Sequence, residues 1–165
     1  MAIRPIRTLG DPVLRQKAKR VTKMDASLLQ LFEDMVETMR DAPGVGLAAP
    51  QIGVSLRMIV IEVPEHPEVI KLYNPEIVRR TGTRRVPEGC LSIPGYRAEV
   101  PRSVTVVAKG RDPEGREVRF KATDLLAQAF EHEIDHINGN LYIDYLNSPE
   151  ELHKIGAEEE AEDGE

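Results

Sequence analysis

The stretch "AFEHEIDHINGN", residues 129–140, places two histidines four positions apart, with a glutamate directly after the first. Residues four apart on a helix lie about 40° from each other, so His132 and His136 would share one face. An adjoining stripe of apolar residues recurs at helical spacing and consists of Leu126, Phe130, Ile134 and Ile137. These spacings predict a mostly buried helix, from about residue 123 to Gly139, whose histidines point into the protein.

Two histidines on one face of a helix could bind a single metal ion. Glu133 would lie about 60–100° around the helix from them. At that angle it is too far away to replace a histidine as a ligand, but near enough to reach a water on the metal, which suits a general base. A satisfied polar core, or a chance match to the HExxH pattern, is the other interpretation of the same residues.

A catalytic metal of tetrahedral geometry needs a third protein ligand and an open position. Downstream, Tyr142 stands where a metzincin would have its third histidine, whereas Glu150 and Glu151 could serve another kind of HExxH zinc peptidase. Upstream stands Cys90, the only cysteine, 42 residues before His132. A lone cysteine is more often a small core residue, but a thiolate beside two imidazoles suits zinc or ferrous iron.

Length and charge limit the class of protein. The 165 residues fit one domain, and six of the 28 acidic residues lie within residues 158–165, so the rest balance the 22 basic residues. We therefore expect no specific nucleic-acid partner and no membrane partner, although "VRRTGTRR" (residues 78–85) is locally basic. The single cysteine forbids an internal disulfide, and no apolar run is long enough for a signal peptide or a membrane span. These features predict a cytoplasmic protein.

The first half of the chain predicts two helices followed by strands. "GDPVLRQKA" (10–18) has the signals of a short helix, with Asp11 as its cap. "MDASLLQLFEDMVETMRDAPG" (24–44) repeats apolar residues at helical spacing, and a proline and a glycine end it. Strands are predicted in "RMIVIEV" (57–63) and "VIKLYNPEIVRR" (69–80), which are rich in β-branched residues.

The second half of the chain predicts a hairpin before the histidine helix and two further elements after it. "VTVVAKGRDPEGREVRFKAT" (104–123) forms two strands around the turn "DPEG". After the histidine helix, "LYIDYL" (141–146) is predicted as a strand, and "SPEELHKIGAEEE" (148–160) as a helix with Ser148 as its cap and Glu151 closing a capping box.

The segment "GVGLAAPQIG" (44–53) taken alone is a helix stop followed by a glycine-rich turn. It lacks the lysine and hydroxyl residue of a phosphate-binding loop. Near a metal centre, Gly44 and Gly46 would let an extended substrate backbone approach, and Gln51 offers an amide donor.

Three stretches, "GVGLAAPQ", "EGCLS" and "HEIDH", occur in the order and at the separations of the three signature motifs of peptide deformylase, which this chain resembles. The resemblance implies an α+β fold, with antiparallel β-sheets surrounding a central helix that carries the HEIDH motif. It implies a single catalytic domain over residues 1–147, with residues 148–165 as a short C-terminal helix and an acidic, disordered tail. The implied reaction is removal of the N-formyl group from the N-terminal methionine of newly synthesised bacterial proteins, releasing formate.

Carried over to this sequence, the resemblance makes Cys90, His132 and His136 the metal ligands. Glu133 becomes the general acid/base acting on a metal-bound water, while the Gln51 side chain and the Leu91 N–H stabilise the oxyanion. The implied cofactor is one divalent ion per chain, Fe²⁺ in the cell, with Zn²⁺, Ni²⁺ or Co²⁺ accepted in the purified protein.

The implied partners are N-formylmethionyl peptides and nascent chains at the ribosome, bound by a monomer. Val45, Gly46 and Gly89 would contact the extended peptide backbone, and Arg97 would contact the peptide farther along. The methionine side chain would enter an apolar pocket formed by Val45, Val86, Leu125 and Ala129.

Two other functions stay open beside this one. One is a zinc peptidase that cleaves internal peptide bonds and takes its third ligand from beyond residue 136. The other is a noncatalytic metal-binding or nascent-chain-binding module.

Glu131 departs from the family pattern, in which glutamine commonly precedes the first histidine. It stands four residues before Asp135, and like charges at this spacing repel by a few tenths of a kcal/mol. We therefore predict that an arginine, Arg102 in the first place, pairs with this side of the helix. The acidic tail (157–165) is expected to serve solubility, leaving any ribosome contact to the basic "RRTGTRR" segment (79–85).

Overall fold

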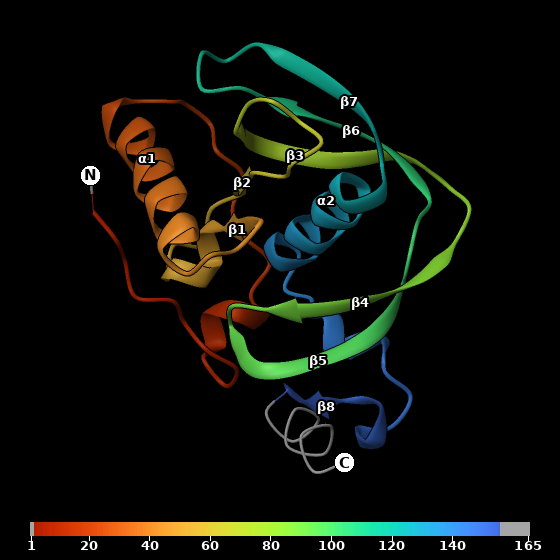
Figure 1. The fold of residues 1–165 in the computed structure, drawn as a ribbon. Coiled ribbons are helices and arrows are strands. Elements are labelled where there is room, and N and C mark those ends of the chain that lie inside the picture. Colours follow the sequence, from red (N-terminus) through yellow and green to blue (C-terminus); the bar gives the residue numbers. More distant parts are fainter. Residues whose placement is uncertain (1, 156–165) are drawn as a thin grey trace.

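The computed structural model describes residues 2–155, and in it the helix that carries both histidines lies at the centre of the molecule (Figure 1). This helix, α2 (Asp124–Ile137), contacts strands of two separate antiparallel sheets. One sheet lies above it and the other below, and its apolar stripe is buried in the core that it shares with the larger sheet. The predicted α+β fold, with antiparallel sheets around a central helix, is confirmed.

The larger sheet has five strands in the order β1-β2-β3-β6-β7, all antiparallel. Its strands are β1 (Gly46–Ala48), β2 (Met58–Ile61), β3 (Ile70–Thr81), β6 (Thr105–Arg111) and β7 (Glu117–Thr123). β2 is buried on both faces, since Ile59 and Ile61 pack toward α2 while Met58 and Val60 pack toward the other helix. This explains why its sequence is a continuous apolar run rather than an alternating one.

The smaller sheet consists of β4 (Arg84–Cys90), β5 (Ile93–Arg102) and β8 (His153–Lys154). β4 and β5 form a hairpin whose register shifts between Glu88 and Cys90. The basic segment 78–85 runs through the end of β3 and the start of β4, and therefore links the two sheets.

The other long helix, α1 (Ala26–Asp41), covers the face of the larger sheet that α2 does not. Asp25 caps it by accepting a hydrogen bond from the Leu28 N–H at 3.0 Å. Two short 3₁₀ helices complete the N-terminal half, Pro12–Arg15, capped by Asp11 as predicted, and Ala49–Ile52.

The strand predicted for residues 141–146 is wrong, because Tyr142–Tyr145 form a 3₁₀ helix. Asp144 turns back to accept a hydrogen bond from the Leu141 N–H at 2.9 Å, which favours a turn over an extended chain. Leu141 and Tyr142 are buried against the smaller sheet. A run this short has the same apolar pattern in a strand and in a buried turn.

The helix predicted from residue 148 is also wrong beyond its first turn. Pro149–Glu151 form a 3₁₀ helix, and β8 follows, paired with β5. Glu151 accepts a hydrogen bond from the Asn147 N–H at 2.6 Å instead of closing a capping box with Ser148. Leu152 packs on the core of the smaller sheet, so pairing with β5 replaces further helix. The tail predicted at 157–165 lies outside the described residues.

Four strands were not anticipated from the sequence: β1, β4, β5 and β8. β1 lies within the segment interpreted as a glycine-rich turn, and β5 follows the cysteine motif without a clear alternating pattern. In the described part of the chain, no helix is both long enough and apolar enough to cross a membrane.

Asn74 offers a test of this fold, because it holds the N-terminal segment against β3. It has a left-handed backbone (φ 49°), and its side chain makes two hydrogen bonds of 2.8 Å with the backbone of Val21. Asn74→Ala should lower the free energy of unfolding by about 2–3 kcal/mol, from two lost hydrogen bonds and backbone strain. Asn74→Gly loses the same hydrogen bonds but adds no backbone strain. Its free energy of unfolding should therefore be about 1 kcal/mol higher than that of the alanine variant. Urea denaturation measures both, and an alanine variant as stable as the parent would contradict the role.

Candidate metal centre and substrate cavity

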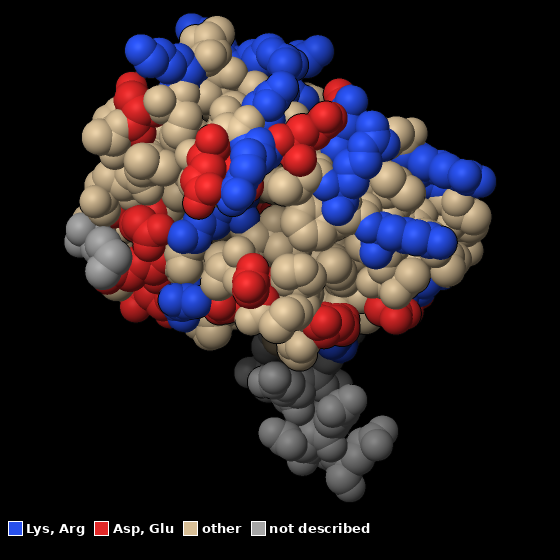
Figure 2. Space-filling view, turned by 90° about the horizontal axis from the view of Figure 1, so that it is seen from above, with Lys and Arg blue, Asp and Glu red and all other residues tan. Residues whose placement is uncertain are grey.

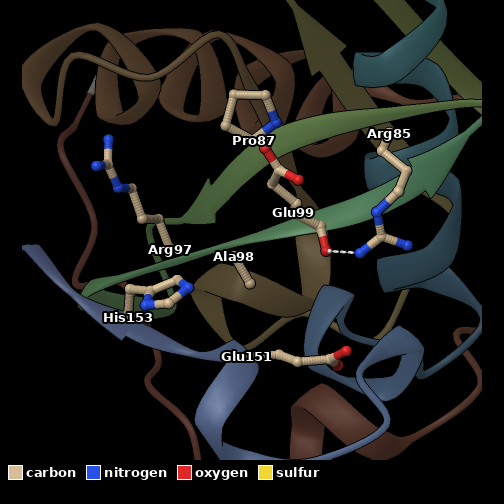
Figure 3. A pocket seen from close by; sticks show the side chains of 7 residues that line it. All are labelled: Arg85, Pro87, Arg97, Ala98, Glu99, Glu151 and His153. Carbon is tan, nitrogen blue, oxygen red and sulfur yellow. Dashed lines mark hydrogen bonds between the residues drawn. The ribbon is translucent and has the colours of Figure 1, made fainter.

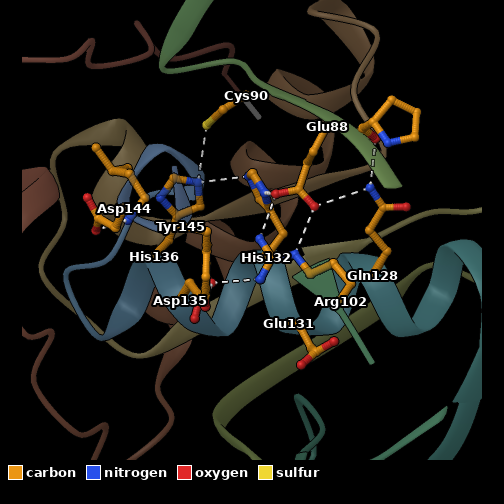
Figure 4. A network of polar contacts seen from close by, with 12 residues as sticks. Glu88, Cys90, Arg102, Gln128, Glu131, His132, Asp135, His136, Asp144 and Tyr145 are labelled. Atoms are coloured by element: carbon orange, nitrogen blue, oxygen red, sulfur yellow. Dashed lines mark hydrogen bonds and ion pairs between the residues drawn. The ribbon is translucent and has the colours of Figure 1, made fainter. Parts of the chain in front are cut away.

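Three potential metal ligands converge beside α2. Cys90, at the end of β4, lies with its Sγ 3.3 Å from His136 Nε2, which is 3.1 Å from His132 Nε2 (Figure 4). All three donor atoms lie within 4.8 Å of one another. A thiolate and two imidazoles are ligands of zinc and of ferrous iron, so the residues fit a divalent metal. The predicted trio is thus brought together from two elements that are 42 positions apart in the sequence.

The electrostatics of the trio favour a cation. Burial lowers the pKa of His136 well below its usual value, so this ring is neutral and able to ligate. Burial also opposes charge on His132, but the Glu133 charge, Cys90 and Glu88 together raise the pKa of His132. Surroundings that attract a proton to this ring would equally attract a metal ion, which competes with protons for the same nitrogen.

Glu88 orients His132, and the sequence analysis missed it. Its Oε2 lies 2.7 Å from His132 Nδ1, which leaves Nε2 to face the trio. Burial alone would raise the pKa of Glu88, but hydrogen bonds from His132 and Arg102 lower it to about 2, so the carboxylate is charged at neutral pH. The available signal was its position two residues before Cys90, because alternate residues of a strand face the same way.

Arg102 neutralises the buried Glu88 with two hydrogen bonds, from Nε at 2.9 Å and Nη2 at 2.6 Å. Its third nitrogen, Nη1, donates to Asp135 at 2.8 Å, as the sequence predicted. The prediction that an arginine pairs with this side of α2 is thereby confirmed. Glu131 has a different partner, since it accepts from the Ser103 N–H at 2.6 Å and from Arg80 Nε at 3.1 Å. The two like charges on α2 therefore have separate cationic partners.

Gln51 points its amide nitrogen toward the centre. The Ala48 N–H donates to Gln51 Oε1 at 2.9 Å, which fixes the amide so that Nε2 lies 3.1 Å from Ser92 Oγ and 3.6 Å from Cys90 Sγ. Leu91 follows Cys90 in the tight turn between β4 and β5 and lines the same cavity.

Glu133 is buried directly beside the trio, on the turn of α2 between the two histidines. Its Oε1 has no hydrogen-bond partner among the described residues. Burial raises the pKa of Glu133 to about 7, which suits a group that both accepts and returns a proton near neutral pH. A Cβ at Gly46 would lie 2.5 Å from Glu133 Oε2, so β1 approaches this carboxylate as closely as only glycine permits.

A cavity of about 450 Å³ opens on this centre. Among its lining residues are most of those predicted for substrate contacts: Val45, Gly46, Gly89, Leu125 and Ala129. Val86 does not line it, and packs instead in the core of the smaller sheet.

Arg97 lines a different cavity, of about 510 Å³, on the outer side of the β4–β5 hairpin (Figure 3). The residues around it are Arg85, Pro87, Ala98, Glu99, Glu151 and His153. β8 pairs with β5 at this point, His153 opposite Arg97. Arg97 is therefore not brought into the cavity that opens on the three metal-ligand candidates.

Comparisons with known proteins agree on one family. The model of the family described as polypeptide deformylase matches residues 3–152. A peptide deformylase of Dehalococcoides mccartyi is 54% identical, and the match covers 97% of this chain and 96% of that protein. The crystal structure of a peptide deformylase from Legionella pneumophila aligns with a TM-score of 0.87 at 48% identity, over 91% of this chain and 89% of that one. That of a Synechococcus elongatus peptide deformylase in complex with actinonin aligns with a TM-score of 0.84 at 44% identity, over 88% and 80%.

The orientation of His132 by Glu88 predicts a measurable loss of metal affinity. Glu88→Gln keeps the shape of the side chain but removes its charge, and should weaken binding of a divalent ion by about 10- to 100-fold. Chelator competition measures the affinity, and thermal unfolding shows whether the variant is folded. Glu99→Gln, on the exposed side of β5, is the matched control and should bind as the parent does. Equal affinity for all three proteins would show that Glu88 does not position the ligand.

Proposed function

This chain belongs to the polypeptide deformylase family of metal-dependent hydrolases, which remove the formyl group from N-terminal methionine, and we propose that its buried centre performs that reaction. The observation that carries the proposal is the convergence of Cys90, His132 and His136 beside a buried Glu133 with a free carboxylate oxygen. The cavity that opens on these residues gives a peptide access to them.

Cys90, His132 and His136 would hold one divalent ion, ferrous iron in the cell. The donor set also suits Zn²⁺, Ni²⁺ and Co²⁺, and ferrous iron lies low in the general affinity order, so purified protein would carry other metals in part. A bound ion would lower the pKa of a coordinated water and polarise the formyl oxygen.

Glu133 accepts a proton from the attacking water and returns it to the departing amine. Its raised pKa, near 7, supports both steps, because a carboxylate of ordinary pKa would hold the proton too weakly to act as an acid. The formyl carbon–nitrogen bond breaks, formate leaves, and the peptide keeps a free amino group.

Gln51 and the Leu91 N–H are the donors proposed for the oxygen that becomes negative in the transition state. The Gln51 amide is held in place by Ala48 before substrate arrives, so no reorganisation is needed during the reaction. Preorganised donors of this kind contribute about 3–4 kcal/mol each.

The substrate would lie extended in the cavity, with its backbone along Val45, Gly46 and Gly89. Leu125 and Ala129 then supply apolar walls for the methionine side chain. Backbone pairing tolerates any sequence, as an enzyme acting on many nascent chains requires. Arg97, on the outer side of the hairpin, would meet only a longer peptide that continues around β5.

The two alternative functions have less support. A peptidase with a downstream ligand would need Glu150 or Glu151 at the centre, but Glu151 faces the other cavity and bonds to Asn147. A noncatalytic binding module would have no use for a buried carboxylate with a pKa near 7 beside the metal ligands.

Nascent chains at the ribosome, in the cytoplasm, are the proposed physiological substrates of a monomer. Lys and Arg side chains, with Asp and Glu among them, are spread over the face seen from above in Figure 2. Arg79, Arg119 and Lys121 of the larger sheet are exposed, and such basic side chains suit contact with ribosomal RNA.

The proposal is tested with formyl-Met-Ala-Ser under anaerobic conditions, using protein reconstituted separately with ferrous iron, zinc, nickel or cobalt. We expect release of formate, no release of acetate from acetyl-Met-Ala-Ser, and the fastest but oxygen-sensitive turnover with iron. Cleavage of internal peptide bonds without formate release would favour a peptidase instead.

Glu133→Gln should retain metal and lose about 10²–10⁴-fold in turnover, because an amide can hydrogen-bond a water but cannot take its proton. Steady-state rates and metal analysis measure the two properties. Glu131→Gln is the control on the same helix, two positions away, and should stay within a few-fold of the parent. A Glu133→Gln enzyme that is as active as this control would rule out the acid/base assignment.

Cys90→Ser should lose most of its metal on dialysis, since a serine hydroxyl is a far poorer ligand than a thiolate. Elemental analysis after dialysis gives the result. Glu151→Gln is the control and should keep its full metal content. If the third ligand came from beyond residue 136, Cys90→Ser would keep its metal and Glu151→Gln would lose it.

A further inference from the structure

The outer end of the substrate cavity is apolar and open to solvent. Of the nine large apolar side chains that are exposed in the described part of the chain, three line this one cavity: Val45, Tyr96 and Ile155, which are 42%, 38% and 38% exposed. Exposed apolar side chains that gather at one opening mark a place where another molecule is bound.

Ile155 reaches the cavity because β8 adds to the free edge of β5. Tyr96 is the partner of Lys154 in this pairing, so Ile155 follows directly after the paired residue. The segment before β8 is held by Leu146 and Leu152, which pack on the core of the smaller sheet. β8 lies beneath β5 (Figure 1), and Ile155 follows it and lines the cavity.

Ile155, like β8, lies beyond the segment matched by the family model, which ends at residue 152. Both residues of β8 and Ile155 come after that point. The family model therefore does not reach Ile155, although the Dehalococcoides mccartyi relative aligns over 97% of this chain.

The direction in which the peptide lies decides which of its residues come near Tyr96 and Ile155. The formyl group must lie at the inner end, beside Cys90 and Glu133, and the methionine side chain next to it against Leu125 and Ala129. Residues that follow the methionine would then lie near the exposed side chains that line the same cavity, Val45, Tyr96 and Ile155.

We propose that Tyr96 and Ile155 form an apolar subsite for the side chain of the second or third residue of the formylated peptide. The C-terminal strand thereby makes this enzyme prefer substrates with an apolar residue after the methionine. This inference rests on the proposed deformylase function. It also extends the catalytic unit past residue 147, because residues 148–155 would then supply part of the substrate site.

The expected effect is moderate, since both side chains are more than one-third exposed. Removing a methylene from a fully enclosed pocket changes specificity by about 10- to 200-fold, so a half-open wall should contribute about 3- to 10-fold. The effect should lie in KM rather than in kcat, because the subsite does not touch the reacting atoms.

The experiment compares four iron-loaded proteins: the parent, Ile155→Ser, Ile155→Leu and Val78→Ser. Val78 is the matched control, because it is 46% exposed, lies on β3 and does not line the cavity. The substrates are formyl-Met-Ala-Ala-Ser and its variants with leucine at the second or the third position. kcat and KM are measured for each pair.

Ile155→Ser should lose the preference for one leucine peptide by about 3- to 10-fold in KM, while formyl-Met-Ala-Ala-Ser stays within twofold. Ile155→Leu and Val78→Ser should keep the preference of the parent. An Ile155→Ser enzyme with unchanged KM values, or with an equal loss on all three peptides, would overturn the subsite.

A binding measurement separates this inference from the proposed function. Calorimetric titration of zinc-loaded Glu133→Gln, with and without Ile155→Ser, gives the affinity for the same formyl peptides without turnover. Selective weakening for a leucine peptide supports the subsite even if no deformylase activity is found. Equal affinities in the two backgrounds reject the subsite even if the enzyme is an active deformylase.

Discussion

The buried ion pair between Arg102 and Glu88 is the interaction on which the rest of the centre depends. It joins the two strands of the β4–β5 hairpin, and through His132 and Asp135 it ties both to α2. A buried carboxylate without a cation would take up a proton, and could then no longer hold the His132 ring by its Nδ1–H. Since buried pairs add little net stability, the value of this one lies in fixing the orientation of a metal ligand.

The antiparallel sheets bring the donors together because each contributes to a different side of α2. β4 carries Glu88 and Cys90 to one side of the helix, where Glu88 contacts His132 and Cys90 lies beside His136. β1 passes on the other side, where Gly46 makes room for the Glu133 carboxylate. The helix is held by apolar packing against the larger sheet and by the polar contacts of His132, Gln128 and Asp135 with the smaller one, so these groups lie on elements that are fixed to each other.

The residues that line the substrate cavity near the candidate metal ligands differ in kind from those at its opening. One part of its lining comes from α2, β1 and β4, which hold the candidate metal ligands and Glu133. Another part comes from the turn after Cys90, from Tyr96 and from Ile155, which are at least partly exposed. A scaffold of this kind keeps one reaction fixed while the residues around the opening adjust which peptides bind well.

The sequence by itself determined the chemistry of the centre. His132, Glu133 and His136 are set by spacing within one helix, and Cys90 is the only thiol, so local periodicity and residue type were sufficient to select them. The same reasoning failed for "LYIDYL" and for the helix after Ser148, because such short segments take the conformation that their neighbours impose. Only the tertiary structure assigned Glu88 to His132, gave Arg102 and Arg80 to different carboxylates, and separated Arg97 from the metal-ligand candidates. Those pairings join positions on different strands, and the direction of a side chain across a sheet depends on register, which no local pattern in this sequence specifies.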